Sequence, residues 1–212
     1  MGKPIIILGA HELGKIALDI LQQNGLIVYG FLDDDHTLQG KAVNHVPILG
    51  NTTEEQYLDL IGKQCDVFIA MEQQAKRQHL ATILREQRKV VPINAIHPSA
   101  IIAESVTLGC GNLVNASVNI GADTTLGSYC ILNTQATIEC NTVIKDFVQV
   151  GVGGIVGAGV TLTERVFIGA GAIVVAGVEI GTAASIGAGS VVLANVKSGQ
   201  AVLGNPATPF KI

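Results

Sequence analysis

The chain has 212 residues, of which 14% are charged, and its formal net charge is −4. This length leaves room for two domains, and an acidic chain without a basic run is a poor partner for nucleic acid or an anionic membrane. No N-terminal stretch combines a basic region, an apolar core and a cleavage site, so we expect a cytoplasmic protein.

The first ninety residues alternate between apolar strand-like runs and helical segments. We expect strands at 5–8, 26–32, 43–50, 66–71 and 90–93. A first helix should follow the first strand and end near 24–25, and two further helices should cover 53–61 and 73–88. This order of elements predicts a small Rossmann-like α/β domain with a parallel sheet over residues 1–94.

A glycine-containing turn joins the first predicted strand to the first helix. Residues 9–14 resemble a phosphate-binding loop that has kept only its first and last glycines. We expect Gly9, His11 and Glu12 in this turn to lie near a bound ligand. A purely structural strand-to-helix turn is the alternative.

Three carboxylates, Asp33, Asp34 and Asp35, follow the second predicted strand. In a Rossmann-like domain this is where the ribose or base of a nucleotide is held. A solvated acidic turn is the alternative. NAD is a less suitable ligand, because the domain is too short for the two-halved dinucleotide fold.

From residue 96 onward an aliphatic residue occupies every sixth position without interruption. The series is Ile96, Ile102, Leu108, Val114, Ile120, Leu126, Leu132, Ile138, Ile144, Val150, Val156, Leu162, Ile168, Val174, Ile180, Ile186 and Val192. A period of six fits neither an α-helix, which repeats near 3.6, nor an isolated strand, which repeats at 2. It is the signature of the hexapeptide β-helix, in which six residues form one side of a triangular coil.

The neighbours of these aliphatics follow the same period. The residue two positions earlier is small or β-branched nearly throughout, and the residue after is often glycine, which we interpret as a corner with positive φ. The repeat predicts a left-handed parallel β-helix of five to six coils over residues 95–212, although parallel crossovers are usually right-handed. The uncharged stretch 180–196 keeps this period, so no membrane insertion is expected.

The four cysteines are expected to be free thiols. Cys110 and Cys140 lie five repeats apart and therefore face different sides of the triangular coil, while Cys130 occupies an inward small position. A zinc enzyme of the β-helix type needs three histidine ligands, and this part of the chain has only His97. We therefore expect no metal.

The order of the two parts and several local motifs resemble one family. It comprises the sugar acetyltransferases that act on a UDP-linked 4-amino-sugar and the related sialic acid O-acetyltransferases (NeuD/PglD type). The residues that carry the resemblance are Gly9, Gly14, Lys15, Gly30-Phe31-Leu32-Asp33-Asp34, Ile69-Ala70-Met71, Arg77, His97-Pro98-Ser99-Ala100, Leu132-Asn133-Thr134, Ile138-Glu139 and Gly204-Asn205-Pro206-Ala207.

The resemblance implies a function and an assembly. The N-terminal domain of such proteins holds the nucleotide-sugar, with acidic residues like Asp33 and Asp34 near the uridine. The β-helix forms a homotrimer, and acetyl-CoA, the co-substrate, lies in the groove between neighbouring β-helices. By position in this sequence, Gln149, Ala170 and Ala188 would line that groove.

The chain departs from the family at its functional histidines. Cys140 stands where the family has its catalytic base, and Asn141 replaces the acidic residue that follows it. Gln149 replaces a histidine that contacts the cofactor, and Leu13 replaces a histidine that faces the sugar. No histidine follows His97.

The resemblance therefore leaves Cys140, Glu139, Asn141 and the motif residue Asn133 as catalytic candidates. A thiol needs a cation or helix terminus to ionise near neutral pH, and Glu139 is a possible weak base. Alternatively, neither residue is catalytic: Cys140 is a small residue that fills a solvent-facing corner, and Glu139 is an exposed carboxylate at the edge. His11 is a further candidate base, acting at a neighbouring subunit's site.

Two functions remain open from the sequence. The first is an acetyltransferase that uses acetyl-CoA to modify a nucleotide-linked amino-sugar or a sugar hydroxyl in surface-glycan biosynthesis. An amine that arrives neutral needs little help beyond proximity. The second is a catalytically silent relative that binds a nucleotide-sugar or CoA, or acts as a scaffold.

Overall fold

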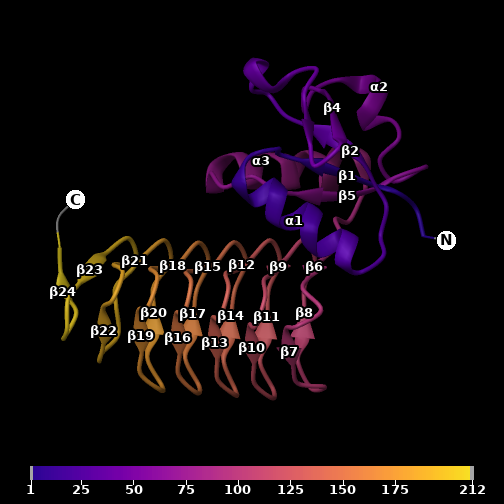
Figure 1. Cartoon of the computed structure of the whole chain (residues 1–212). Coiled ribbons are helices and arrows are strands. Elements are labelled where there is room, and N and C mark those ends of the chain that lie inside the picture. The colour runs from indigo at the N-terminus through magenta and orange to yellow at the C-terminus, as the bar shows by residue number, and fades with distance from the viewer. Residues whose placement is uncertain (1, 211–212) are drawn as a thin grey trace. The chain divides into compact units, whose positions relative to one another are not determined.

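The computed structural model describes residues 2–210 of the chain. The chain divides into two compact units, and the boundary falls between Pro98 and Ser99. The first unit is an α/β domain, and the second is a stack of short parallel strands (Figure 1).

The first unit is built on a five-stranded sheet with the order β3-β4-β2-β1-β5. Its strands are β1 (Ile5–Leu8), β2 (Val28–Leu32), β3 (Ala42–Val43), β4 (Val46–Gly50) and β5 (Asp66–Ile69). All pairs are parallel except β3 with β4. The inner strand β1, between β2 and β5, is apolar at every position and at most 1% exposed, as expected of a parallel strand covered on both faces.

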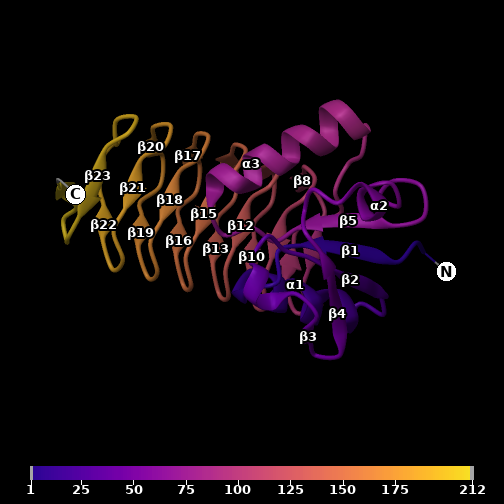
Figure 2. The same ribbon diagram turned by 90° about the horizontal axis from the view of Figure 1, so that it is seen from above.

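Helices lie along this sheet (Figure 2). They are α1 (Glu12–Gln23), α2 (Glu55–Leu58) and α3 (Gln74–Ile83), with a 3₁₀ turn η1 (His36–Leu38) and a π-helical turn η2 (Leu84–Arg88). The buried face of α1 repeats at helical spacing through Leu13, Ala17, Leu18, Ile20 and Leu21. The Rossmann-like prediction is confirmed.

Two predicted elements of this unit differ in the structure. The strand predicted at residues 90–93 is wrong: the segment makes one sheet-like bond, from Ile93 N to Val67 O at 3.0 Å. Pro92 has no N–H to extend a ladder. The strand predicted at 43–50 is a hairpin, because Asn44 and His45 adopt positive φ between β3 and β4.

The second unit is a parallel β-helix with three faces, each made of strands from successive coils. The first face holds β7 (Ile101–Ile102), β10 (Asn119–Ile120), β13 (Thr137–Ile138), β16 (Ile155–Val156), β19 (Ile173–Val174) and β22 (Val191–Val192). The second holds β8 (Thr107–Leu108), β11 (Thr125–Leu126), β14 (Val143–Ile144), β17 (Thr161–Leu162) and β20 (Glu179–Ile180). The third holds β9 (Leu113–Val114), β12 (Ile131–Leu132), β15 (Gln149–Val150), β18 (Phe167–Ile168), β21 (Ser185–Ile186), β23 (Ala201–Leu203) and the antiparallel β24 (Thr208–Pro209). The short strand β6 (Ala95–Ile96) precedes the unit boundary.

The interior of this unit is the periodic aliphatic series. From Ile120 to Val192, every residue of the series is at most 3% exposed. Stacked strands pair one coil apart, as Asn119 does with Ile101 and with Thr137. The left-handed hexapeptide β-helix predicted from the repeat is confirmed.

The corner glycines have a different role from the one predicted. Positive φ occurs two residues later than expected, at positions such as Gly153 and Gly171, and not at Gly151 or Gly169. A Cβ on Gly151 would lie only 2.5 Å from the backbone nitrogen of Ala170 in the next coil. These glycines are therefore explained by the close approach of successive coils.

Candidate functional site

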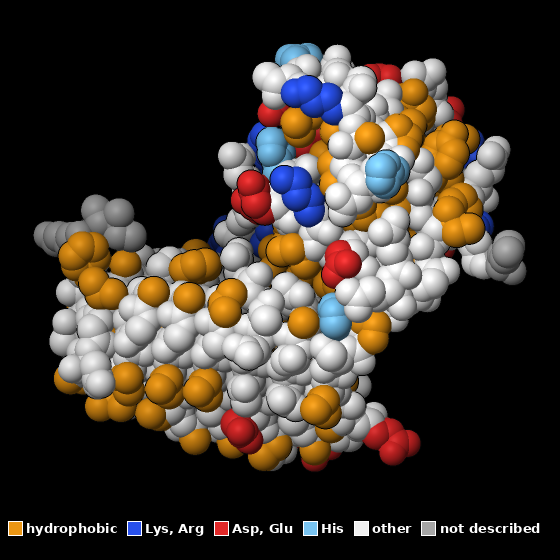
Figure 3. All heavy atoms as spheres, in the orientation of Figure 1, with side chains coloured by type: hydrophobic (Ala, Val, Ile, Leu, Met, Phe, Trp, Pro, Cys, Tyr) orange, Lys and Arg blue, Asp and Glu red, His pale blue; other side chains and the backbone are white. Residues whose placement is uncertain are grey.

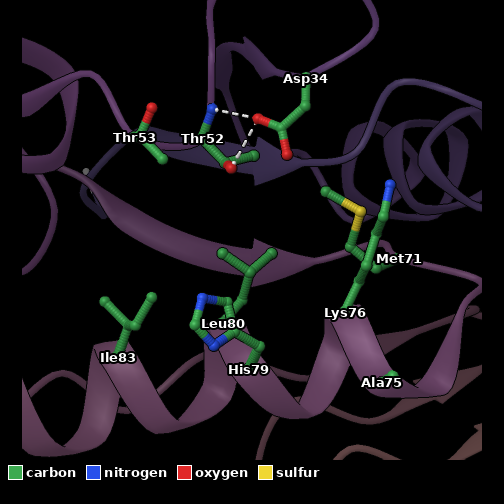
Figure 4. Close-up of a pocket in the computed structure, with 9 residues that line it drawn as sticks. All are labelled: Asp34, Thr52, Thr53, Met71, Ala75, Lys76, His79, Leu80 and Ile83. Atoms are coloured by element: carbon green, nitrogen blue, oxygen red, sulfur yellow. Dashed lines mark hydrogen bonds between the residues drawn. The ribbon is translucent and has the colours of Figure 1, made fainter.

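The carboxyl edge of the first unit's sheet carries a groove made of three adjoining cavities. The first cavity, of about 410 Å³, lies between the loop after β4 and helix α3 (Figure 4). The second, of about 240 Å³, opens beside the β1–α1 turn, and the third, of about 290 Å³, opens beside the three aspartates. Met71 and Lys76 line all three, so we refer to them together as the edge groove.

The β1–α1 turn is shaped by its two glycines. A Cβ on Gly9, whose φ is +113°, would lie 2.4 Å from the carbonyl oxygen of Ala70 at the end of β5. A Cβ on Gly14 would lie 2.2 Å from the carbonyl oxygen of Gly9. The turn is therefore packed closely against neighbouring backbone, and it brings His11 and Glu12 to the second cavity.

Asp33 fixes the loops on either side of it. Its buried carboxylate accepts hydrogen bonds from Ala10 N at 2.7 Å and from Asp35 N at 2.9 Å. His11 Nε2 lies 3.8 Å from Asp33 Oδ1 and 3.6 Å from Asp35 Oδ2. These contacts join the Asp33 carboxylate to the β1–α1 turn and to the loop after β2, and Asp33 also lines the third cavity.

Asp34 faces the first cavity. Its Oδ1 accepts hydrogen bonds from the backbone N–H of Thr52 at 3.0 Å and from the Thr52 hydroxyl at 2.7 Å (Figure 4). Thr52 lies two residues after the end of β4, so this pair links the segments that follow β2 and β4. Of the two aspartates predicted near a nucleotide, Asp34 is the one whose carboxylate lines the larger cavity.

Two carboxylates of the groove have a lowered pKa. The pKa of Glu12 is lowered first by its own backbone N–H at the start of α1, with smaller electrostatic contributions from Lys15 and His11, against some desolvation. Hydrogen bonds from the side chain and backbone of Thr37 lower the pKa of Asp35. Both groups therefore stay ionised at neutral pH, and the groove keeps a negative rim.

The side chain of Leu13 is buried, at 5% exposure, while its backbone N–H donates to Glu72 Oε1 at 3.3 Å. Glu72 also lines the second cavity. Any contact of Leu13 with a sugar is therefore limited to its backbone, since the side chain is not on the surface.

Several lining residues were missed at the sequence level, among them Thr52, Met71, Lys76 and His79. They follow β4 and β5 or lie in the first turns of α3. The carboxyl ends of parallel strands meet at one edge of a sheet, so the residues after β4 and β5 could have been predicted to lie there in the same way as those after β1 and β2.

Arg77 holds the loop after β5 from inside the fold. It is 1% exposed, and its Nη1 donates to the carbonyl oxygens of Met71 at 2.7 Å and Glu72 at 3.3 Å. The backbone of a loop that lines the edge groove is thus fixed by a buried cation on α3.

In the β-helix unit, Glu139, Cys140 and Asn141 form the corner between the first and second faces. Cys140 is half-buried and Glu139 is exposed. Among the described residues, none forms a hydrogen bond or ion pair with the Cys140 thiol. Asn141 occupies the left-handed position of the corner, with φ of 57°, a conformation that asparagine tolerates well.

The remaining β-helix candidates lie elsewhere on the same unit. Asn133, Ala170 and Ala188 belong to the corner between the third and first faces, and Gln149 opens β15 on the third face. The Asn133 amide donates to Val150 O in the next coil at 2.9 Å, which holds the corner. Within one chain, strand β13 separates this corner from Cys140.

The surface of the β-helix unit carries rows of hydrophobic side chains and few charges (Figure 3). The exposed apolar residues include Ile155, Phe167 and Ile173 on outward strand positions. The four cysteines are free, and the inward Cys130 is fully buried, both as predicted. Across residues 2–210, no His, Cys, Asp and Glu side chains gather into a set that could hold a metal, and no helix there has the length and apolarity to cross a membrane.

Comparisons with known proteins give a consistent result. The family profile of the PglD N-terminal domain matches residues 4–84. A histidine-to-alanine variant of GDP-perosamine N-acetyltransferase from Caulobacter crescentus, solved with CoA and GDP-perosamine, is 31% identical with a TM-score of 0.91, and the match covers 99% of this chain and 97% of that one. No curated protein sequence matches the chain.

Two further solved structures are similar over nearly their full length. The acetyltransferase domain of PglB from Neisseria gonorrhoeae, in complex with acetyl coenzyme A, is 27% identical with a TM-score of 0.90, covering 99% of this chain and 100% of that one. WeeI from Acinetobacter baumannii is 26% identical with a TM-score of 0.71, covering 98% and 99%. The chain therefore belongs to the NeuD/PglD-type family of hexapeptide-repeat sugar acetyltransferases.

Proposed function

We propose that the protein is an acetyltransferase that moves an acetyl group from acetyl-CoA to a nucleotide-linked amino-sugar or sugar hydroxyl in surface-glycan biosynthesis. One observation carries the proposal: the edge groove lies at the carboxyl ends of parallel strands, where α/β folds bind nucleotides, in a chain similar throughout to an enzyme solved with CoA and GDP-perosamine. The amine is the preferred acceptor, since that relative is an N-acetyltransferase.

We assign roles to the two parts of the chain accordingly. Residues 1–94 would hold the nucleotide-sugar, with the base near Asp34 and the phosphates and sugar near Gly9, His11, Glu12 and the backbone of Leu13. Lys76 supports this arrangement, because it offers a positive charge to a diphosphate from every cavity of the groove.

Residues 95–212 would hold acetyl-CoA through Gln149, Ala170 and Ala188, in a homotrimer that places the co-substrate between neighbouring β-helices. The corner of Ala170 and Ala188 supports this role. Its coils approach so closely that Gly169 has no room for a Cβ, which would lie 2.5 Å from Ala188 N. A corner of glycine and alanine leaves the backbone accessible to an extended ligand.

The reaction forms a C–N bond as the amine nitrogen attacks the thioester carbonyl, and it breaks the C–S bond as CoA leaves as a thiol. The amine must lose a proton along the way. We assign its acceptance to the thiolate form of Cys140, at the position of the family's catalytic histidine, with the Glu139 carboxylate as a second, weak base, while Asn141 and Asn133 shape the two corners. Proximity supplies much of the rate for a neutral amine.

A catalytically silent binding protein is the second candidate function. The observation that favours it is the thiol of Cys140, which has neither a hydrogen bond nor an ion pair to activate it among the described residues. No histidine follows His97. Such a protein would still bind a nucleotide-sugar or CoA.

Titration calorimetry of acetyl-CoA into the full chain, followed by a thiol-release assay with nucleotide-linked amino-sugars, distinguishes the two functions. The acetyltransferase predicts binding and turnover, and a Cys140→Ala, Glu139→Gln double variant should lose turnover while keeping acetyl-CoA affinity. Binding without turnover on any amino-sugar would support the silent protein. Unchanged turnover in the double variant would remove both residues from the mechanism.

A further inference from the structure

A side-chain carboxylate of the chain occupies the end of α1 where a phosphate group would bind. We propose that Glu72 competes with the phosphates of a ligand: its side chain holds the backbone N–H of Leu13, and a phosphate-bearing ligand has to displace it. This inference rests on the proposed function, because it takes the edge groove as the site of a nucleotide-sugar.

The N-terminus of α1 lies at the second cavity, which both Glu12 and Glu72 line. The first N–H groups of a helix have no partner inside it, and together with the helix dipole they favour an anion. The N-cap residue His11 makes no side-chain hydrogen bond to the helix. Instead, Glu72 Oε1 accepts a hydrogen bond from Leu13 N at 3.3 Å, across 59 residues of the chain. The anion position of this helix is therefore filled from the loop after β5.

A second carboxylate lies at the same helix end. Glu12 accepts a hydrogen bond from its own backbone N–H, which is the main cause of its lowered pKa, and the Glu72 side chain also contributes to that lowering. Among the described residues that line the second cavity, Lys76 is the one with a permanent positive charge. A diphosphate that enters this cavity therefore meets two carboxylates, and it reaches the Leu13 N–H only after Glu72 has left it.

Glu72 can leave Leu13 without a movement of the loop. Arg77, which is buried, donates from Nη1 to the backbone carbonyl oxygens of Met71 and Glu72 and so fixes the backbone there. The Glu72 side chain is exposed, so water can replace its hydrogen bond. Exposed side chains change rotamer within nanoseconds. Displacement thus requires the rotation of one side chain, while the wall of the groove stays in place.

The competition affects ligands according to their other contacts. Every ligand that places a phosphate at Leu13 loses the same factor in affinity, because each breaks the same hydrogen bond. Pyrophosphate has no further group to contact the groove, so it is held weakly. A nucleotide-sugar also extends into the first and third cavities and stays bound. Glu72 therefore keeps small anions out of a site meant for complete substrates.

Three substitutions separate the hydrogen bond from the charge. Glu72→Ala removes both. Glu72→Asp keeps the charge but is shorter by one carbon–carbon bond, about 1.5 Å, so it should not reach an N–H that is already 3.3 Å from Glu72. Glu72→Gln keeps an oxygen that can accept from Leu13 N and loses the charge. Glu86→Gln is the matched control, because Glu86 is exposed on η2 and lines none of the three cavities.

Titration calorimetry of pyrophosphate, UDP and GDP into the full chain measures the competition. A hydrogen bond to a charged group is worth about tenfold in affinity. We therefore expect all three probes to bind Glu72→Ala about tenfold more tightly than the unaltered chain. Glu72→Asp and Glu72→Gln should show smaller gains, and Glu86→Gln should show none. The Leu13 amide resonance should shift as pyrophosphate binds to Glu72→Ala.

A gain in affinity is not a by-product of damage, because a distorted or unfolded site binds less. Circular dichroism and thermal melting check that each variant folds. If Glu72→Ala does not fold, the affinities of Glu72→Asp and Glu72→Gln decide the question.

The inference is overturned if Glu72→Ala binds the probes no more tightly than the unaltered chain, or if no probe binds any variant. It is also overturned if Glu72→Asp matches the unaltered chain while Glu72→Gln gains, because charge alone would then explain the effect. Acetyl transfer to a nucleotide-linked amino-sugar, with probe affinities unchanged in Glu72→Ala, would keep the acetyltransferase and reject the competition. A gain in affinity without acetyl transfer to any amino-sugar would keep the competition and reject the enzyme.

Discussion

Replacing Arg77 by methionine should destabilise the first unit and loosen the edge groove together. Arg77 is 1% exposed and donates from Nη1 to Met71 O and Glu72 O. Each hydrogen bond from a charged donor contributes about 1.5–3 kcal/mol, and the two carbonyls would lose that partner. Methionine fills part of the volume and supplies no donor. We expect a loss of about 3–5 kcal/mol in the free energy of unfolding, a large part of the ~5–15 kcal/mol typical of domains.

Urea denaturation followed by circular dichroism at the helix band measures this loss. Helices α1, α2 and α3 all belong to the first unit, so the helical signal reports that unit. Hydrogen exchange should also speed up in the peptide containing Met71 and Glu72. Arg85→Met is the control, because the Arg85 side chain is 68% exposed and its replacement should cost less than about 0.5 kcal/mol. A loss below about 1 kcal/mol in Arg77→Met, with unchanged exchange at Met71, would refute the reasoning, since two charged hydrogen bonds are worth more.

Three further outcomes are expected. Ile168→Ala, at a fully buried position of the β-helix, should lower the free energy of unfolding by about 2–5 kcal/mol, because it leaves a cavity. A fall in melting temperature no larger than that caused by an alanine substitution at an outward position would contradict this. The lowered pKa of Asp35, due to hydrogen bonds from Thr37, adds stability that is present above the ordinary carboxyl pKa and disappears as the pH falls through the lowered value. Asp35→Asn should therefore be less stable than the parent at pH 7, and the difference should shrink in urea melts at acid pH. Gly9→Ala should lower both the melting temperature and UDP affinity, because its Cβ would lie 2.4 Å from Ala70 O; wild-type values for both would show that the turn adapts.

The β-helix could be predicted from the sequence almost completely. Its coils are local and identical in construction, so one period of six specifies both the interior series and the pairing of each strand with the next coil. The role of the corner glycines could not be read in this way. A clash such as that between a Cβ on Gly151 and Ala170 N involves residues nineteen positions apart and appears only when the coils are stacked.

The first unit shows where sequence patterns lose information. The apolar run of β1 and the helical spacing of α1 identify those elements, because burial on a sheet or helix face leaves a periodic trace. Residues 90–93 are also apolar, yet Pro92 prevents a ladder there and the chain makes a single sheet-like bond. The four-residue helix α2 is shorter than the predicted segment 53–61, since short helices depend on tertiary packing.

The sequence by itself determined the two-part fold, the inward series of the β-helix and the loss of every histidine after His97. The run of aspartates also identified the acidic turn after β2, but nothing in the sequence distinguished the environment of Asp33 from that of Asp34. Only the tertiary structure separated them: Asp33 is buried under backbone donors, while Asp34 keeps one oxygen toward a cavity. The physical reason is that strand order brings the ends of β2, β4 and β5 together, and contacts between segments so distant in the chain leave no local pattern in it.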